Sequence, residues 1–192
     1  MADVVRSTMQ PAEGFRSREA GSFYVQMLDQ DRVLFESLKG ITPQELEWQP
    51  ERGMNTIGML LAHNAIVDVF WTQLAILGLK EHDSMPALGI GMDDDGLPLA
   101  PDAGPPPNLN GKLLAYYEDL ISRGRAYVKD AWSQVTDADM EKETARERPD
   151  GSRRILNVRW AMYHILEHFA GHRGQIQLLR HLYHASVGAA AK

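Results

Sequence analysis

Cysteine is absent from the 192-residue chain. Disulfide bonds, metal sites built on protein thiolates and a cysteine nucleophile are therefore excluded. The hydrophobic share of 44% and the charged share of 24% are ordinary for a globular domain, and a chain of this length can bury a core of useful size. Any thiol chemistry would need a bound small molecule.

An excess of positive charge is also absent, since the formal net charge is −6 and the pI is about 5.6. A nucleic-acid-binding surface needs Lys and Arg to neutralise phosphates, so we predict no nucleic-acid partner. The most apolar run, TIGMLLAHNAIVDVFW, is interrupted by His63, Asn64 and Asp68, which makes it a poor membrane span. The first ten residues lack the apolar core of a signal peptide. We expect a soluble cytoplasmic protein without a membrane partner.

Helical periodicity and end signals predict four long helices. They are expected over residues 17–38, 55–79, 109–135 and 158–184. Asn55 is a suitable N-cap for the second helix, and TPQE from Thr42 predicts a short helical turn with a capping box that ends at Glu45. Pro-Asp-Gly at 149–151 predicts a hairpin turn before the last helix.

These elements predict an all-α fold, a four-helix bundle of the antiparallel type with one small hairpin. Residues 81–108 are dense in Gly, Pro and Asp and predict a long loop between the second and third helices. We expect an N-terminal extension over residues 1–16, the bundle domain over 17–185 and a fraying tail over 186–192.

Three of the seven histidines follow one another at four-residue spacing in YHILEHFAGHRGQI. With an advance of about 100° per residue, His168 and His172 fall within the apolar stripe of the last helix, and His164 falls at its edge. His63 lies at the centre of the apolar stripe of the second helix. A buried imidazole without a partner costs about 1–3 kcal/mol, and one metal ion would satisfy several at once.

Distance selects the histidines that can share an ion. His164 and His172 are separated by about 12 Å along the helix axis, at a rise of about 1.5 Å per residue, whereas each i, i+4 pair can meet at one point. Only the pair His168 and His172 lies inside the stripe. We therefore predict a metal site formed by His63, His168 and His172, with water in an open position.

Two rival metal sites fit the sequence less well. HILEH at 164–168 matches the H-x-x-E-H signature of inverzincins, but no Asp or Glu follows His168 to supply the further ligand. A di-iron site needs carboxylates in the core, and both Asp68 and Glu167 lie off their helix stripes. A mononuclear site rich in histidine is favoured.

The two histidine segments, LLAHNAIVDVFW and HILEHFAGHRGQI, resemble those of the DinB/YfiT-like superfamily of metalloenzymes. The resemblance covers most of the chain and implies a four-helix bundle, often a homodimer, that binds one divalent metal through three histidines. Carried over to this sequence, the ligands fall on His63, His168 and His172. Some relatives are thiol-dependent transferases or isomerases that use glutathione, mycothiol or bacillithiol.

We therefore expect a metal-dependent enzyme that activates a small-molecule thiol for transfer to an electrophile. The cofactors would be one divalent ion (zinc, nickel, iron or manganese) and a low-molecular-weight thiol. Gln175 is a candidate contact to the ligand, and His164 a candidate partner that orients His168 or its neighbour. The alternatives are a hydrolase that uses metal-bound water, for which Asp93 to Asp95 could fold over the site, and a non-catalytic stress-response module.

Overall fold

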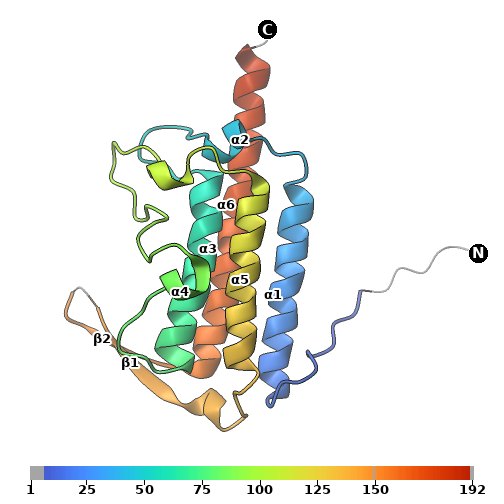
Figure 1. Cartoon of the computed structure of the whole chain (residues 1–192), viewed down its shortest axis with the longest axis vertical. Coiled ribbons are helices and arrows are strands. Elements are labelled where there is room, and N and C mark those ends of the chain that lie inside the picture. The colour runs from blue at the N-terminus through green and yellow to red at the C-terminus, as the bar shows by residue number, and fades with distance from the viewer. Residues whose placement is uncertain (1–6, 149, 191–192) are drawn as a thin grey trace, which may run out of the picture.

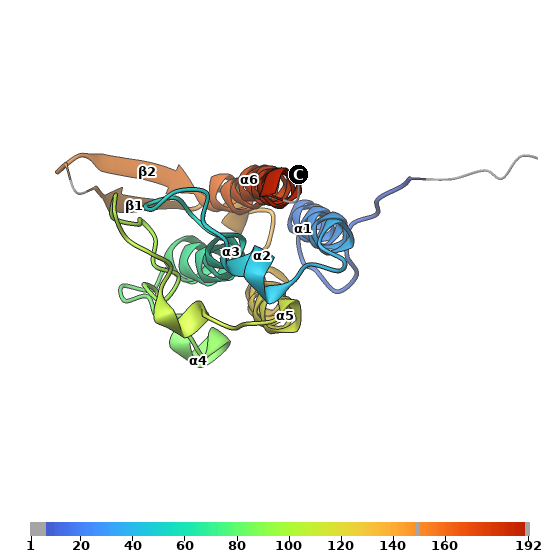
Figure 2. The same cartoon turned by 90° about the horizontal axis from the view of Figure 1, so that it is seen from above.

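The computed structural model describes residues 7–148 and 150–190 of the chain. Four long helices form the bundle: α1 (Arg18–Ser37), α3 (Ile57–Trp71), α5 (Leu114–Trp132) and α6 (Val158–Ala190). Seen along the bundle axis, α3 and α1 each lie between α5 and α6 (Figure 2). The all-α fold predicted from the sequence is confirmed, because the sheet consists of two short strands.

The short elements lie at the ends and on one side of the bundle (Figure 1). They are α2 (Pro43–Glu47), a π-helical turn (Thr72–Ile76), α4 (Met85–Leu88), two 3₁₀ turns (Pro107–Leu109 and Asp139–Glu141), β1 (Glu143–Glu147) and β2 (Arg153–Asn157). The strands pair antiparallel as predicted, with Ala145 opposite Ile155. Of the predicted Pro-Asp-Gly turn, Pro149 lies outside the described residues, and Gly151 takes a φ of 79°.

The helix directions correct the expectation of an antiparallel type of bundle. Figure 1 shows α1 and α6 running upward, whereas α3 and α5 both run downward. The reason is the connection over residues 77–113, which is long enough to carry the chain back to the top of the bundle before α5 begins. The two helices that carry the clustered histidines, α3 and α6, are nevertheless antiparallel neighbours.

Several helix ends differ from the predicted ones. Thr56, not Asn55, caps α3, since its hydroxyl accepts from the Met59 amide. The helix α5 begins at Leu114 rather than 109, and α6 continues to Ala190, so most of the predicted fraying tail is helical. Local signals place such ends only to within a few residues. The domain boundaries themselves stay a prediction.

The predicted capping box of α2 is only half formed. The Thr42 hydroxyl accepts from the Glu45 amide, as expected. The Glu45 carboxylate instead accepts from Arg180 of α6 and lies 3.3 Å from His184. Because Glu45 is only 2% exposed, a cationic partner satisfies its charge better than the backbone amide would.

The helix α3 is the centre of the core. The segment Ile57–Ile76 is long and apolar enough to cross a membrane by composition, but 83% of its apolar window is buried inside the protein. Gly58 allows α5 to approach closely, since a Cβ there would lie 2.4 Å from the Tyr117 hydroxyl. The apolar run noted in the sequence is thus the core helix of the bundle.

A buried ionic cluster joins the helices at mid-height. Arg125 of α5, 4% exposed, donates twice to Asp31 of α1 at 2.8 Å and also to Asp68 of α3. Its guanidinium lies 4.7 Å from the ring centroid of Phe169 on α6. Burial raises the pKa of both Asp31 and Asp68, and the positive charge of Arg125 opposes that rise.

We predict that Arg125→Met destabilises the fold by about 3–5 kcal/mol at pH 8, because two buried carboxylates lose their counter-charge. The contribution of a carboxyl to folding stability decreases as the pH rises through its raised folded-state pKa. The loss of stability in Arg125→Met should therefore be smaller at pH 5 than at pH 8. Urea unfolding at both pH values measures this. Arg32→Met, which removes an exposed pair with Asp29, should cost less than about 1 kcal/mol. Equal losses in the two variants would contradict the role of the cluster.

Candidate metal centre

The antiparallel packing of α3 on α6 brings three histidines together. The Nε2 atom of His168 lies 3.2 Å from Nε2 of His63 and 3.1 Å from Nε2 of His172. The three ligand atoms all lie within 4.8 Å of one another, and each side chain is half-buried. The cluster predicted from the two helix stripes is therefore present as a group that could hold a metal ion.

The outer nitrogens of two rings have acceptors as partners. His63 Nδ1 lies 2.7 Å from Asp95 Oδ2, and His172 Nδ1 lies 2.8 Å from Gln175 Oε1. An ionised carboxylate only accepts, and so does an amide oxygen. Each Nδ1 must therefore carry a proton, and the neutral form of either ring then directs its Nε2 lone pair at the centre of the cluster.

This arrangement fits a bound cation. A neutral His168 with its proton on Nε2 could donate to only one of the two neighbouring Nε2 atoms. The second neighbouring Nε2 atom would then face His168 with no hydrogen between them. A divalent ion accepts all three lone pairs at once, and three neutral imidazoles leave coordination positions for other ligands. The donor set is the nitrogen-rich kind that zinc, nickel and iron accept.

Burial keeps the imidazoles in the form that binds metal. Burial, together with the neighbouring His172, His63 and His164, lowers the pKa of His168 to about 3. Burial also lowers the pKa of His172, against the hydrogen bond that His172 donates to Gln175, which raises it. Both rings are thus neutral near pH 7 and do not need to lose a proton before they bind an ion.

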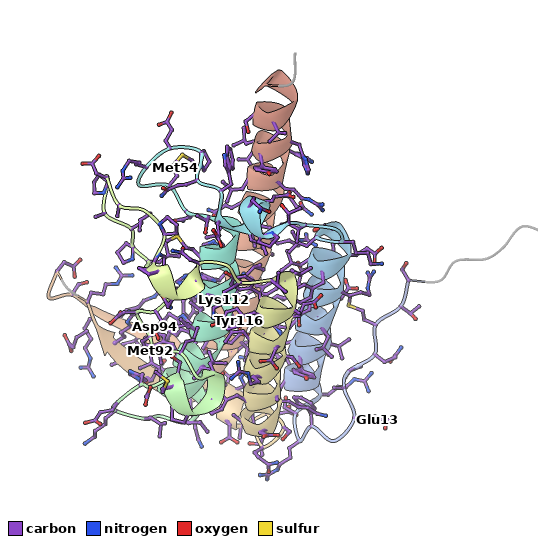
Figure 3. All side chains as sticks on the ribbon, turned by 45° about the horizontal axis from the view of Figure 1, so that its top comes forward. Glu13, Met54, Met92, Asp94, Lys112 and Tyr116 are labelled. Atoms are coloured by element: carbon purple, nitrogen blue, oxygen red, sulfur yellow. The ribbon has the colours of Figure 1, made fainter. Side chains whose placement is uncertain are left out.

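Asp95 reaches the cluster from the loop between α4 and α5. Its Oδ1 accepts from the Leu97 amide at 2.9 Å, and the residue is 2% exposed. The Asp94 carboxylate closes the preceding turn by accepting a hydrogen bond from the Gly91 amide. The Asp94 carbonyl accepts a second hydrogen bond from the Asn108 side-chain amide. Met92 and Asp94, labelled in Figure 3, mark this loop where it runs beside the bundle.

The sequence anticipated part of this arrangement. It predicted that the segment Asp93 to Asp95 could fold over the site, and of these carboxylates Asp95 binds a cluster histidine. A carboxylate that holds the outer nitrogen of a histidine fixes its tautomer and makes it a stronger ligand. A proline- and glycine-rich loop carries no periodicity, so the particular aspartate could not be chosen from the sequence.

Gln175 and His164 do not lie quite as predicted. The Gln175 oxygen faces His172, so this side chain orients a candidate ligand. His164 Nδ1 lies 3.2 Å from Glu167, and its ring stacks on Trp160 at 4.6 Å. Over the described ranges His164 makes no hydrogen bond to His168, whose ring centroid is 5.8 Å away. His164 therefore acts on His168 through ring packing and through the electrostatic effect that lowers the pKa of His168.

A cavity of about 490 Å³ opens beside His63 and His168, within the usual size range of small-molecule sites. It is lined by His63, Ile66, Val67, Phe70, Trp71, His82, Met92, Asp93, Asp95, Leu97, Arg146, His164 and His168. Among the wall residues that were not predicted as site residues are Trp71, His82 and Arg146. They come from the end of α3, the following loop and the hairpin, whose meeting only the tertiary fold determines.

Comparison with known proteins places the chain in a family. Residues 24–185 match the family model described as mycothiol-S-transferase, and no curated protein matches. The matched range starts within α1 and includes the three clustered histidines, Asp95 and the hairpin. Because the match spans far more than half of the sequence, the chain belongs to the mycothiol S-transferase family, a DinB/YfiT-like family.

Proposed function

We propose that this protein is a metal-dependent thiol S-transferase, in which His63, His168 and His172 hold one divalent ion. The observation that carries the proposal is the convergence of the three Nε2 atoms beside a cavity of substrate size. The family name suggests mycothiol as the thiol. A small electrophile would occupy the cavity, which two aromatic side chains, Phe70 and Trp71, help to line.

A divalent ion at this site would hold the thiol as its thiolate, which is the nucleophilic form. The protein's own residues prepare that position. Asp95 and Gln175 fix two imidazoles in the correct tautomer, and the apolar wall displaces water from the reacting groups. In the transfer the sulfur–carbon bond forms while the carbon–leaving-group bond breaks. The leaving group takes the electron pair, and the thiol proton goes to solvent.

The one carboxylate that contacts the histidine cluster, Asp95, fits transfer better than hydrolysis. A hydrolase with metal-bound water would usually employ a nearby carboxylate as general base. Both oxygens of Asp95 are already used, one by His63 and one by the Leu97 amide. A purely structural ion would typically have four protein ligands, whereas the cluster in residues 7–148 and 150–190 offers three. The choice of metal, the homodimer and the cytoplasmic location stay predictions.

The first prediction concerns metal binding. The wild-type protein should bind one Zn²⁺ per chain, measured by isothermal titration calorimetry and by metal content after dialysis. Loss of a residue that hydrogen-bonds a metal ligand typically lowers metal affinity about 10–100-fold. His168→Ala removes a ligand itself, so it should lower the affinity for Zn²⁺ by more than that. His181→Ala is the control, because this exposed histidine lies on the same helix. Unchanged affinity in His168→Ala would refute the three-histidine site.

A second prediction tests the role of the loop. Asp95→Asn removes the negative charge that holds the Nδ1 proton of His63, so the affinity for Zn²⁺ should fall about 10–100-fold. Asp93→Asn is the matched control, since this exposed neighbour lines the cavity but does not bind a cluster histidine. Equal affinities for the two variants, with unchanged circular dichroism, would show that Asp95 does not support the ion.

The third prediction concerns activity. Metal-loaded protein should conjugate mycothiol with 1-chloro-2,4-dinitrobenzene and release chloride, followed by the absorbance of the thioether. Chelation should remove the activity, addition of Zn²⁺ or Ni²⁺ should restore it, and His168→Ala should lack it. Activity that persists after the ion has been removed would disprove metal dependence, and absence of conjugation with every thiol and electrophile would disprove the transferase function.

A further inference from the structure

Two arginines lie side by side on the face of the hairpin that meets the cavity. Arg146 of β1 is directly opposite Arg154 of β2 in the strand register, so both side chains project from the same face. Arg146 lines the cavity. Two like charges at opposite positions of an antiparallel pair repel each other and weaken the pairing, so this arrangement needs a compensating interaction.

Aromatic rings provide part of that compensation. The Arg146 guanidinium lies 5.1 Å from the ring centroid of Phe70 and 5.3 Å from that of Trp71. The Arg154 guanidinium lies 4.0 Å above the Trp160 ring, which stacks in turn on His164 in the cavity wall. Stacking of this kind holds a guanidinium in place and leaves its N–H edge free to donate.

Neither arginine forms an ion pair within 4.0 Å in the described part of the chain, although the charge of Arg154 contributes to lowering the pKa of Glu167. Two neighbouring arginines do form ion pairs. Arg153 lies 3.9 Å from Glu147, and Arg159 binds Glu19 and Glu141. Asp93 also lines the cavity, but it forms no ion pair with Arg146 within 4.0 Å. The donors of Arg146 are therefore available to an anion in the cavity.

A second polar group in the same wall lacks a partner. His82 Nε2 is covered and makes no hydrogen bond among the residues that the structure describes. The His82 ring packs edge-on against Phe70, with ring centroids 4.9 Å apart. Arg146 and His82 thus approach the same aromatic ring from the hairpin and from the loop after α3. Both residues are therefore placed by Phe70, and a substrate oxygen beside this ring would give Arg146 a partner.

We propose that Arg146 is a specificity-determining residue that binds the carboxylate of a planar, conjugated or aromatic electrophile, with Phe70 and Trp71 beside the planar part. The planar fork of an arginine matches a carboxylate in a two-bond geometry. This inference rests on the proposed function, because it places the electrophile in the cavity beside the thiol. Arg154, directly opposite Arg146 in the strand register, adds positive charge to the same face of the hairpin.

A matched pair of electrophiles tests the proposal. In 4-chloro-3-nitrobenzoate a thiolate forms a bond to the ring carbon while the carbon–chlorine bond breaks, so that thiol and aryl chloride give thioether, chloride and a proton. The amide, 4-chloro-3-nitrobenzamide, undergoes the same reaction without the negative charge. The variant is Arg146→Gln, and the control is Arg153→Gln, which lies on the same hairpin but on its opposite face.

The binding measurement is made without thiol, by quenching of tryptophan fluorescence in metal-loaded protein. Wild type and Arg153→Gln should bind the acid about tenfold more tightly than the amide, as expected for a charge-assisted hydrogen bond of at least about 1.4 kcal/mol. Arg146→Gln should lose this preference. If Arg146→Gln keeps it, the proposal is wrong, and loss of the preference upon chelation would then identify the ion as the carboxylate site.

The kinetic measurement uses mycothiol with each electrophile. In Arg146→Gln the ratio of kcat/KM for acid over amide should fall about tenfold, while the KM for mycothiol stays constant. A rise in that KM with both electrophiles would overturn the proposal, because Arg146 would then bind the thiol. If no protein conjugates either compound, the transferase function fails, yet the binding measurement still decides whether Arg146 recognises the carboxylate.

Discussion

The site depends on one constraint. Three imidazole nitrogens face one another, and there are too few hydrogens between them for each nitrogen to take part in a hydrogen bond. Nε2 of His168 lies 3.1–3.2 Å from two other Nε2 atoms, a separation at which lone pairs repel unless a proton or a cation lies between them. Asp95 and Gln175 hold the protons of His63 and His172 on the outer nitrogens. The surroundings thus keep the centre of the cluster free for a cation.

The bundle supplies the rigidity that such a site needs. Two of the histidines lie one helical turn apart on α6, and the third reaches them from α3, which is buried on almost all sides. The Arg125 cluster joins Asp31, Asp68 and the ring of Phe169, and so connects all four long helices immediately beside His168. Buried ionic groups add little net stability to a fold, but breaking one is costly, which favours a single packing arrangement.

The sequence predicted what helical periodicity determines and little of what loops determine. The four long helices and the three clustered histidines follow from apolar stripes, because side chains on one helix face must meet the core, and the hairpin follows from its Pro-Asp-Gly turn signal. The parallel course of α3 and α5 was not predicted, since it depends on the path of residues 77–113. His82 and Arg146 were missed for the same reason: their place in the cavity is set by contacts between distant segments, and no local pattern marks them.

In the proposed function, ion binding and substrate recognition lie on different parts of the fold. The candidate ligands are on two long helices, whereas Asp95, His82 and Arg146 come from a loop and a hairpin outside the bundle. Loops and hairpins tolerate sequence change better than packed helices do. A substitution at Arg146 would change the charge of the cavity wall on the hairpin, whereas the clustered histidines lie on α3 and α6. A fixed thiol-activating centre could thus accept different electrophiles through changes in these outer segments alone.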